Sequence, residues 1–293
     1  MIKIIPPKIF SFSECIAFLK RSRQSLLHRV YEREIYKALR IAGRKILIRI
    51  TFDQRALIIT FPQAQPTHHM KQHIKKYVLL WFDLERDISS FYHMAKADSI
   101  LCQLTEKYYG YRMIRIPDFF EAMSWAIIGQ QIHLTFAYRL KKRLVEYYGE
   151  KLMWEGVDFW LFPKPDKIAL LNVSDLRNLQ FSRRKAEYII DIARLLSEGN
   201  ISKEMFQQKN YINLKKQLMR LRGVGHWTAD YVMMRYFGRS EAFPIADVGL
   251  HRALEDRLTL GRRPTIEEIR KRAKSWRGWE AYATFYLWRS LYE

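Results

Sequence analysis

Cysteine is scarce in this sequence, and long apolar runs are missing. The 293 residues include 2 cysteines, Cys15 and Cys102, which lie far apart and lack metal-ligand spacing. We therefore expect two free thiols and no disulfide framework, and a four-cysteine iron–sulfur cluster is excluded. No uninterrupted apolar run reaches the length that crosses a bilayer. Residues 1–10 hold Pro6-Pro7 and two lysines instead of the apolar core of a signal peptide, which predicts a soluble cytoplasmic protein.

Acidic residues are few relative to basic ones. Lys and Arg total 51 and Asp and Glu total 30, so the formal net charge is +21. A field of this sign attracts polyanions, and nucleic acid is the polyanion that we expect. An anionic membrane is the competing interpretation, but the cations are spread along the chain and form no isolated basic amphipathic tail. With 48% hydrophobic residues, the chain can bury a core for two or three domains.

Residues 1–75 are predicted to form an α+β accessory domain with a small antiparallel sheet. Two segments with strand-like composition flank a turn at residues 53–55, which indicates a β-hairpin. Ser13 is positioned to cap a helix over 14–21. The segments that are expected to form strands are residues 25–30, 35–41, 45–52 and 56–61.

Residues 76–293 are predicted to form an all-helical body, because helical periodicity dominates there. One continuous helix is expected over 118–148, and the aromatic stretch 154–165, with its prolines, is typical of a packed loop that covers a core. The fold class is thus mainly α, with an N-terminal α+β domain.

Residues 63–73 form a polar segment with three histidines. His69 and His73 are four residues apart and would share one face of a helix, a spacing that a metal site can use. No Asp, Glu or Cys nearby completes a set of ligands, so a solvated linker is the favoured interpretation.

Residues 218–250 contain the most informative pattern. A helix with leucines at helical spacing ends near Leu221, and Gly223-Val224-Gly225 then allows a tight turn. A second helix is expected from His226 to Phe237. Backbone amides at such a turn, beside a helix N-terminus, form a natural seat for phosphate.

Asp247 is the candidate catalytic residue. It follows the stretch Phe243-Pro244-Ile245-Ala246, and an acid in a mostly apolar neighbourhood is a candidate for chemistry. An Asp before a helix is more often an N-cap than a catalytic group, and Gly-x-Gly alone is a weak signal. These residues taken singly leave both interpretations open.

In combination, these residues resemble a known family. Leu-Arg-Gly-Val-Gly-His-Trp-Thr-Ala over residues 221–229, with an Asp 247 − 227 = 20 residues after Trp227, resembles the helix-hairpin-helix superfamily of DNA glycosylases. Lytic members of that superfamily hold a Schiff-base lysine at the position of Trp227. The tryptophan resembles the alkylpurine branch, DNA-3-methyladenine glycosylase II. The motifs cover roughly residues 115–293, and the N-terminal part resembles the accessory domain of that branch by pattern only.

The resemblance implies roles for individual residues. It makes Asp247 catalytic, and it makes Gln131, in Ile-Ile-Gly-Gln-Gln, the side chain inserted into the DNA stack where a nucleotide has been extruded. The implied base pocket consists of Trp227, Tyr231 and Trp288. The implied phosphate-binding hairpin consists of Gly223, Val224, Gly225 and His226. On spacing alone, surface glutamines and a core aromatic stripe through Trp288 are the alternatives.

The function implied is that of a monofunctional glycosylase in base excision repair. Such an enzyme flips alkylated purines, for example 3-methyladenine and 7-methylguanine, out of double-stranded DNA and hydrolyses the glycosidic bond, which leaves an abasic site. Whether Asp247 acts as a base or as an electrostatic stabiliser stays open. The alternatives are a glycosylase for oxidised or mismatched bases and a non-catalytic helix-hairpin-helix repair protein.

The resemblance also implies partners. We expect no cofactor or metal site, apart from a monovalent cation such as relatives hold on the hairpin carbonyls. The expected partner is damaged double-stranded DNA, and the protein is expected to act as a monomer. The DNA and the base pocket are expected to lie between two helical lobes. The expected location is the cytoplasm, with an activity associated with the bacterial nucleoid.

Overall fold

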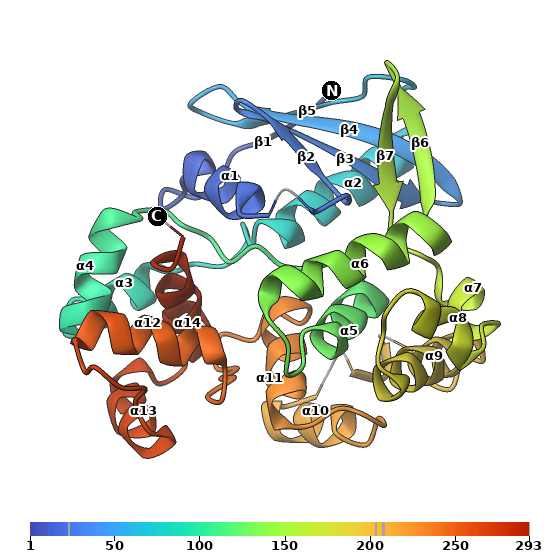
Figure 1. Ribbon diagram of the computed structural model, residues 1–293. Helices are drawn as coiled ribbons and strands as arrows, with labels where there is room; N and C mark the ends of the chain where they lie inside the picture. The colour runs from blue at the N-terminus through green and yellow to red at the C-terminus, as the bar shows by residue number, and fades with distance from the viewer. Residues whose placement is uncertain (23, 203, 207–208, 293) are drawn as a thin grey trace.

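The chain folds into an N-terminal sheet that lies over a helical body (Figure 1). The structure is a computed structural model and describes residues 1–22, 24–202, 204–206 and 209–292. The predicted fold class, mainly α with a small N-terminal antiparallel sheet, is confirmed.

The five N-terminal strands form one antiparallel sheet in the order β1-β5-β4-β3-β2. The predicted hairpin around residues 53–55 is confirmed as β4 and β5, and the earlier predicted segments overlap β2 and β3. β1 is an additional strand at the sheet edge. The strands are β1 (Ile2–Ile4), β2 (Arg29–Tyr31), β3 (Glu34–Ile41), β4 (Arg44–Phe52) and β5 (Leu57–Thr60).

Helix α1 (Phe12–Lys20) begins two residues earlier than predicted. Its N-cap is Ser11, whose Oγ accepts from the backbone N of Glu14 at 3.3 Å, and the predicted cap Ser13 lies inside the first turn. The carbonyl of Gly110 accepts from the backbone N of Ser11 at 2.8 Å and so fixes where the chain enters the helix. The cap position is thus set by a segment about a hundred residues away.

A second hairpin covers the outer face of the sheet. The stretch 154–165 was predicted to cover a core, which is confirmed, but as a loop, which was wrong. Glu155 and Gly156 have φ of 47° and 73°, as in the two-residue turns that match strand twist. Phe159 is buried there against Tyr36, with ring centroids 5.9 Å apart. The hairpin consists of β6 (Glu150–Trp154) and β7 (Val157–Leu161).

The helical body contains thirteen α-helices among the described residues, and in that part of the chain no helix is long and apolar enough to cross a membrane. The α-helices are α2 (His68–Trp81), α3 (Ser89–Ala95), α4 (Ser99–Lys107), α5 (Phe119–Ile128), α6 (Leu134–Tyr148), α7 (Pro165–Ala169), α8 (Val173–Asn178), α9 (Arg183–Ser197), α10 (Tyr211–Leu218), α11 (His226–Arg235), α12 (Val248–Leu258), α13 (Ile266–Arg272) and α14 (Glu280–Arg289). Short 3-10 turns lie at Glu204–Phe206 and Ala273–Trp276.

Two predicted helix boundaries were wrong. α2 begins inside the predicted linker, because Thr67 Oγ1 accepts from the backbone N of Met70 and caps the helix there. The continuous helix predicted over 118–148 is broken into α5 and α6: Gly129 is the C-cap of α5 and Gln131 has a left-handed φ of 51°. The break leaves a short loop exposed between the two helices.

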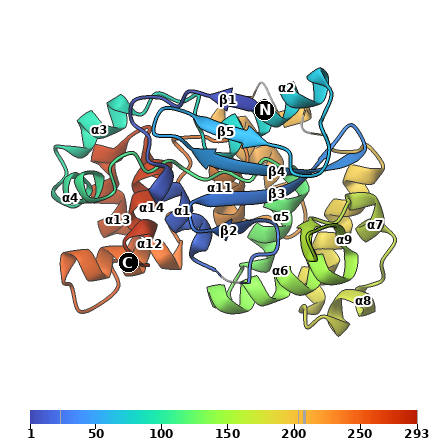
Figure 2. The same cartoon turned by 90° about the horizontal axis from the view of Figure 1, so that it is seen from above.

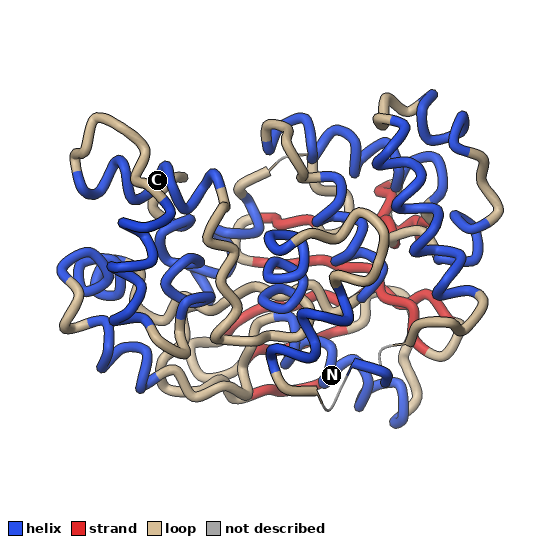
Figure 3. Tube along the Cα trace, turned by 90° about the horizontal axis from the view of Figure 1, so that it is seen from below, coloured by secondary structure: helices blue, strands red, loops and turns tan. Residues whose placement is uncertain are grey.

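α11 runs through the middle of the helical body (Figures 1 and 2). Its residues from Thr228 to Arg235 are all buried, so it is enclosed on every side. Asp230 accepts from Tyr211 Oη and from Lys215 Nζ, each at 2.7 Å, which ties α10 to α11. In Figure 3, which views the molecule from below, helices lie over the face of the sheet that is turned toward the viewer.

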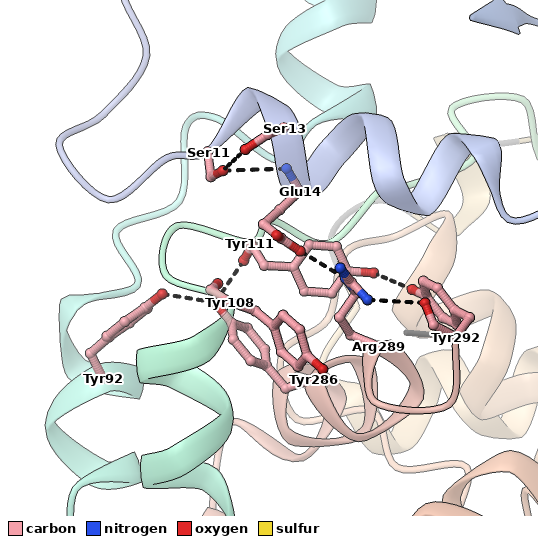
Figure 4. A network of polar contacts seen from close by, with 9 residues as sticks. All are labelled: Ser11, Ser13, Glu14, Tyr92, Tyr108, Tyr111, Tyr286, Arg289 and Tyr292. Carbon is pink, nitrogen blue, oxygen red and sulfur yellow. Dashed lines mark hydrogen bonds and ion pairs between the residues drawn. The ribbon is translucent and has the colours of Figure 1, made fainter.

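α14 is anchored by an aromatic and ionic network (Figure 4). Tyr286 Oη lies 2.8 Å from Tyr92 Oη, and Arg289 Nε donates to Glu14 Oε2 at 2.7 Å. The stripe predicted as core is confirmed as buried at Tyr282, Phe285 and Tyr286. Trp288, on the same helix, is only half-buried, and the network fixes its position.

Candidate active site

The hairpin between α10 and α11 exposes backbone at the N-terminus of a buried helix. Gly223 has a φ of 85°, and a Cβ at this position would lie 2.2 Å from the ring of Tyr188. Gly225 is the N-cap of α11 and supplies no side-chain cap, and it is exposed together with His226. The first amides of a helix lack partners within the helix, so this turn can receive an anion.

Asp247 is the N-cap of α12 and also the meeting point of two tryptophans. Its Oδ1 accepts from the backbone N of Leu250 at 2.9 Å and from Trp288 Nε1 at 2.8 Å. Its Oδ2 accepts from Trp227 Nε1 at 3.0 Å. The N-cap interpretation is therefore confirmed, and the same carboxylate is held by three N–H donors from three elements. An anionic acceptor strengthens each of these bonds.

The ring of Tyr231 contacts both of the tryptophan rings that hold this carboxylate. The ring centroids of Trp227 and Tyr231 are 5.3 Å apart, and those of Tyr231 and Trp288 are 6.0 Å apart. Tyr231 Oη accepts from Trp125 Nε1 at 2.7 Å and from Arg235 Nη1 at 2.8 Å. Burial raises the pKa of the Tyr231 hydroxyl. Its oxygen is therefore engaged with the core.

Gly249, the second residue of α12, makes room for the tryptophan. A Cβ at this position would lie 3.0 Å from both Asp247 Oδ1 and Trp288 Nε1. Such a distance is tighter than ordinary contact, so an added side chain would displace one of the two. No local sequence pattern indicates this role of Gly249, because the role depends on a helix some forty residues further along the chain.

The Gly-Gln-Gln loop places its two glutamines differently. Gln131 is exposed. Gln130 is half-buried, and its Nε2 donates to the carbonyl of Gly223 and to Thr228 Oγ1, both at 2.9 Å. The role of Gln130 was not foreseen. The signal was present, because two adjacent glutamines in an apolar segment need partners if either is buried.

The histidine segment does not gather ligands. Among the described residues, no group of three or more His, Cys, Asp or Glu side chains could hold a metal ion. His73 Nδ1 lies 2.9 Å from the carbonyl of His69, within α2. These histidines belong to an exposed helix surface.

Two family models match the chain. The model described as "HhH-GPD superfamily base excision DNA repair protein" matches residues 124–278, which is more than half of the chain. The model described as "8-oxoguanine DNA glycosylase, N-terminal domain" matches residues 9–123. The two matches meet at 123/124, and the domain boundary expected at 75/76 stays a prediction.

Individual proteins are similar over the whole length. A "DNA-3-methyladenine glycosylase" of Bacillus subtilis (strain 168) is 40% identical over 295 aligned positions, which cover 100% of this chain and 97% of the relative. A "3-methyladenine dna-glycosylase from Archaeoglobus fulgidus" has the same fold, with a TM-score of 0.85, 23% identity and coverage of 98% and 97%. An 8-oxoguanine glycosylase/lyase of Clostridium acetobutylicum, solved with double-stranded DNA, follows at a TM-score of 0.75, 19% identity and coverage of 98% and 96%.

The full-length similarity and the family match agree with the helix-hairpin-helix geometry and with the carboxylate beside it. The chain therefore belongs to the HhH-GPD superfamily of base excision DNA repair proteins, and it is a DNA N-glycosylase.

Proposed function

We propose that the protein flips alkylated purines out of double-stranded DNA and excises them by hydrolysis, and that Asp247 is the catalytic residue. The observation that carries this proposal is the Asp247 carboxylate, held by the indole N–H groups of Trp227 and Trp288 at 3.0 and 2.8 Å. The relative of Bacillus subtilis, named for 3-methyladenine, supports the choice of substrate class.

The chemistry follows from the charge of the substrate. An N-alkylated purine such as 7-methylguanine is cationic, and a cation over an aromatic face gains about 0.5 to 2 kcal/mol. A cationic base is already a good leaving group, so the remaining need is to stabilise an oxocarbenium-like sugar. The Asp247 carboxylate meets that need, either by its charge or by orienting the attacking water. Because residue 227 is tryptophan, no lysine stands there to form a Schiff base, and the strand should stay intact.

The proposed DNA contacts lie on two loops. The amides of Gly223, Gly225 and His226 receive a phosphate, whereas the Val224 amide donates to the carbonyl of Leu221 at 3.1 Å and is already engaged. Gln131 fills the stack after extrusion of the nucleotide. The exposed cations Lys216 and Arg220, just before the hairpin, favour the same partner. We propose that the protein acts as a monomer.

A monovalent cation on the hairpin is part of this proposal. The hairpin offers backbone carbonyl oxygens, a donor type that suits hard cations. One of them, Gly223 O, already accepts from Gln130 at 2.9 Å. Duplex binding in potassium and in tetramethylammonium at equal ionic strength tests this expectation, and equal affinities would contradict it.

Defined duplexes that carry one lesion each test the function. We expect excision of 7-methylguanine and 3-methyladenine, and strand cleavage only after alkali. The match of residues 9–123 to an 8-oxoguanine glycosylase domain makes 8-oxoguanine the rival substrate to include, with mismatches. Faster excision of 8-oxoguanine would favour the rival enzyme, and binding without any base release would favour a non-catalytic repair protein.

Replacing Gly225 with valine is expected to weaken binding to all duplexes alike, by about tenfold, because phosphate contacts carry no sequence information. Gly225 has a φ of −91°, and a Cβ there meets nothing within 4 Å, so the free protein tolerates the change. Fluorescence anisotropy with damaged and undamaged duplexes measures it. Gly223→Ala serves as the contrast, since it should lower the melting temperature instead. A loss confined to damaged duplexes would contradict the assignment.

Replacing Gly249 with alanine is expected to slow single-turnover excision by about tenfold without lowering the melting temperature. The added Cβ must push apart Asp247 Oδ1 and Trp288 Nε1, each 3.0 Å away. Alanine also has a higher helix propensity than glycine, which offsets part of the cost of this displacement. Rates and melting curves on the same sample separate the two effects, and an unchanged rate would show that the contact has no role.

A further inference from the structure

The loop that carries Gln131 and the hairpin that we propose to bind phosphate are joined by one side chain. Gln130 reaches from the end of α5 to both sides of the hairpin. Its Nε2 donates to the carbonyl of Gly223, before the turn, and to Thr228 Oγ1, after it, each at 2.9 Å. These two contacts span 93 and 98 residues of sequence.

The direction of the Gln130 amide follows from its partners. A backbone carbonyl can only accept, so the NH2 end of the amide must face Gly223. The Thr228 hydroxyl, which is buried, can accept from the same group. A hydrocarbon side chain of the same length would leave both oxygens without this donor.

α9 supports the same junction from behind. Lys185 is buried and its Nζ donates to the carbonyl of Ile128, the last residue of α5, at 2.8 Å. Tyr188, one turn further along α9, packs against Gly223 so closely that no Cβ fits there. The end of α5 and the hairpin are therefore both held by one face of α9.

Gln131 follows directly after this junction. Its backbone is left-handed, with a φ of 51°, a conformation that is uncommon for a residue with a side chain. Its side chain is exposed. A residue so placed can enter DNA at a defined point only if the preceding residue is fixed.

We propose that Gln130 is a positioning residue that braces the Gln131 loop against the hairpin. The position at which the hairpin binds the DNA backbone then determines the point at which Gln131 enters the base stack. This inference rests on the proposed function, in which Gln131 fills the space of the extruded nucleotide. Gln130 itself does not touch the reacting atoms. Its effect is therefore on extrusion and not on bond cleavage.

Gln130→Met tests the brace, because methionine keeps the length and removes the donor. We expect single-turnover excision of 7-methylguanine opposite cytosine to fall about tenfold, for two lost hydrogen bonds. Opposite an abasic site, where extrusion costs less, the same lesion should lose less than about threefold. Gln103→Met, on the exposed surface of α4, is the matched control and should leave both rates unchanged.

A double-mutant cycle shows whether Gln130 acts through Gln131. Adding Gln130→Met to Gln131→Ala should cost less than about twofold beyond Gln131→Ala alone, since the braced side chain is already gone. Additive losses, or equal losses on the two substrates, would overturn the brace and indicate a merely structural residue.

A 2-aminopurine beside the lesion reports insertion without chemistry and separates the two levels of the proposal. If the wild-type protein inserts Gln131 but releases no base, the proposed function is refuted. The fluorescence change with Gln130→Met would still test whether Gln130 braces the loop. Equal fluorescence changes for wild type and Gln130→Met would refute the brace alone.

Discussion

Replacing Asp247 with asparagine is expected to reduce single-turnover excision of 7-methylguanine by about 10² to 10⁴-fold. Asparagine has nearly the same shape and removes the negative charge that the developing oxocarbenium requires. It is also as good an N-cap as aspartate, so its oxygen can still accept from the backbone N of Leu250. If the amide oxygen keeps the place of Oδ1, the amide NH2 takes the place of Oδ2 and Trp227 Nε1 loses its acceptor. Rates at saturating enzyme therefore measure the combined loss of the charge and of this one hydrogen bond.

Two further variants guard this result. Asp247→Ala also removes the cap of α12, which costs about 1 kcal/mol, so it should lower the melting temperature more than Asp247→Asn does. Asp118 caps α5 by accepting from the backbone N of Glu121 at 2.7 Å, and Asp118→Asn should excise at the wild-type rate. Excision by Asp247→Asn within threefold of wild type would remove Asp247 from the mechanism.

Replacing Trp288 with phenylalanine is expected to slow excision of every lesion by roughly 10- to 100-fold. The indole N–H donates to Asp247 Oδ1 at 2.8 Å, and a hydrogen bond to a charged group contributes about 1.5 to 3 kcal/mol. Phenylalanine keeps an aromatic face and loses this donor. Trp227→Phe should act in the same direction through Oδ2.

Leucine at position 288 separates the face of the ring from its N–H group. Trp288→Leu loses both the aromatic face and the N–H group. Its excision rate on cationic 7-methylguanine should therefore be about tenfold lower than that of Trp288→Phe. On neutral hypoxanthine the two variants should have equal rates. Trp160→Phe, on the half-buried strand β7, is the control for the substitution itself. Equal losses on all substrates, accompanied by lower melting temperatures, would show that Trp288 serves only as core.

Features with a local signal could be predicted from the sequence. The glycines of Gly223-Val224-Gly225 indicate a turn by their residue type, and an aspartate before a helix, such as Asp247, indicates an N-cap. Neither prediction needs a tertiary contact. Trp288 was different, because its spacing alone indicates a core stripe and only the family resemblance pointed to a pocket.

Features that depend on distant segments could not be predicted. Gly249 is needed because Trp288 arrives from α14, and Gln130 matters because Gly223 lies beside it. The β6–β7 hairpin was missed since its aromatic side chains pack on a sheet formed by residues that lie more than a hundred positions earlier. In each case the partner is set by tertiary packing, which no local pattern encodes.

The most direct measurement is the identity of the free bases released from methylated double-stranded DNA by the wild-type protein and by Asp247→Asn, separated by chromatography. We predict that wild type releases 3-methyladenine and 7-methylguanine and leaves strands that break only in alkali, while Asp247→Asn releases almost none. Release of neither base by wild type, or equal release by the two proteins, would contradict hydrolytic excision at the Asp247 carboxylate.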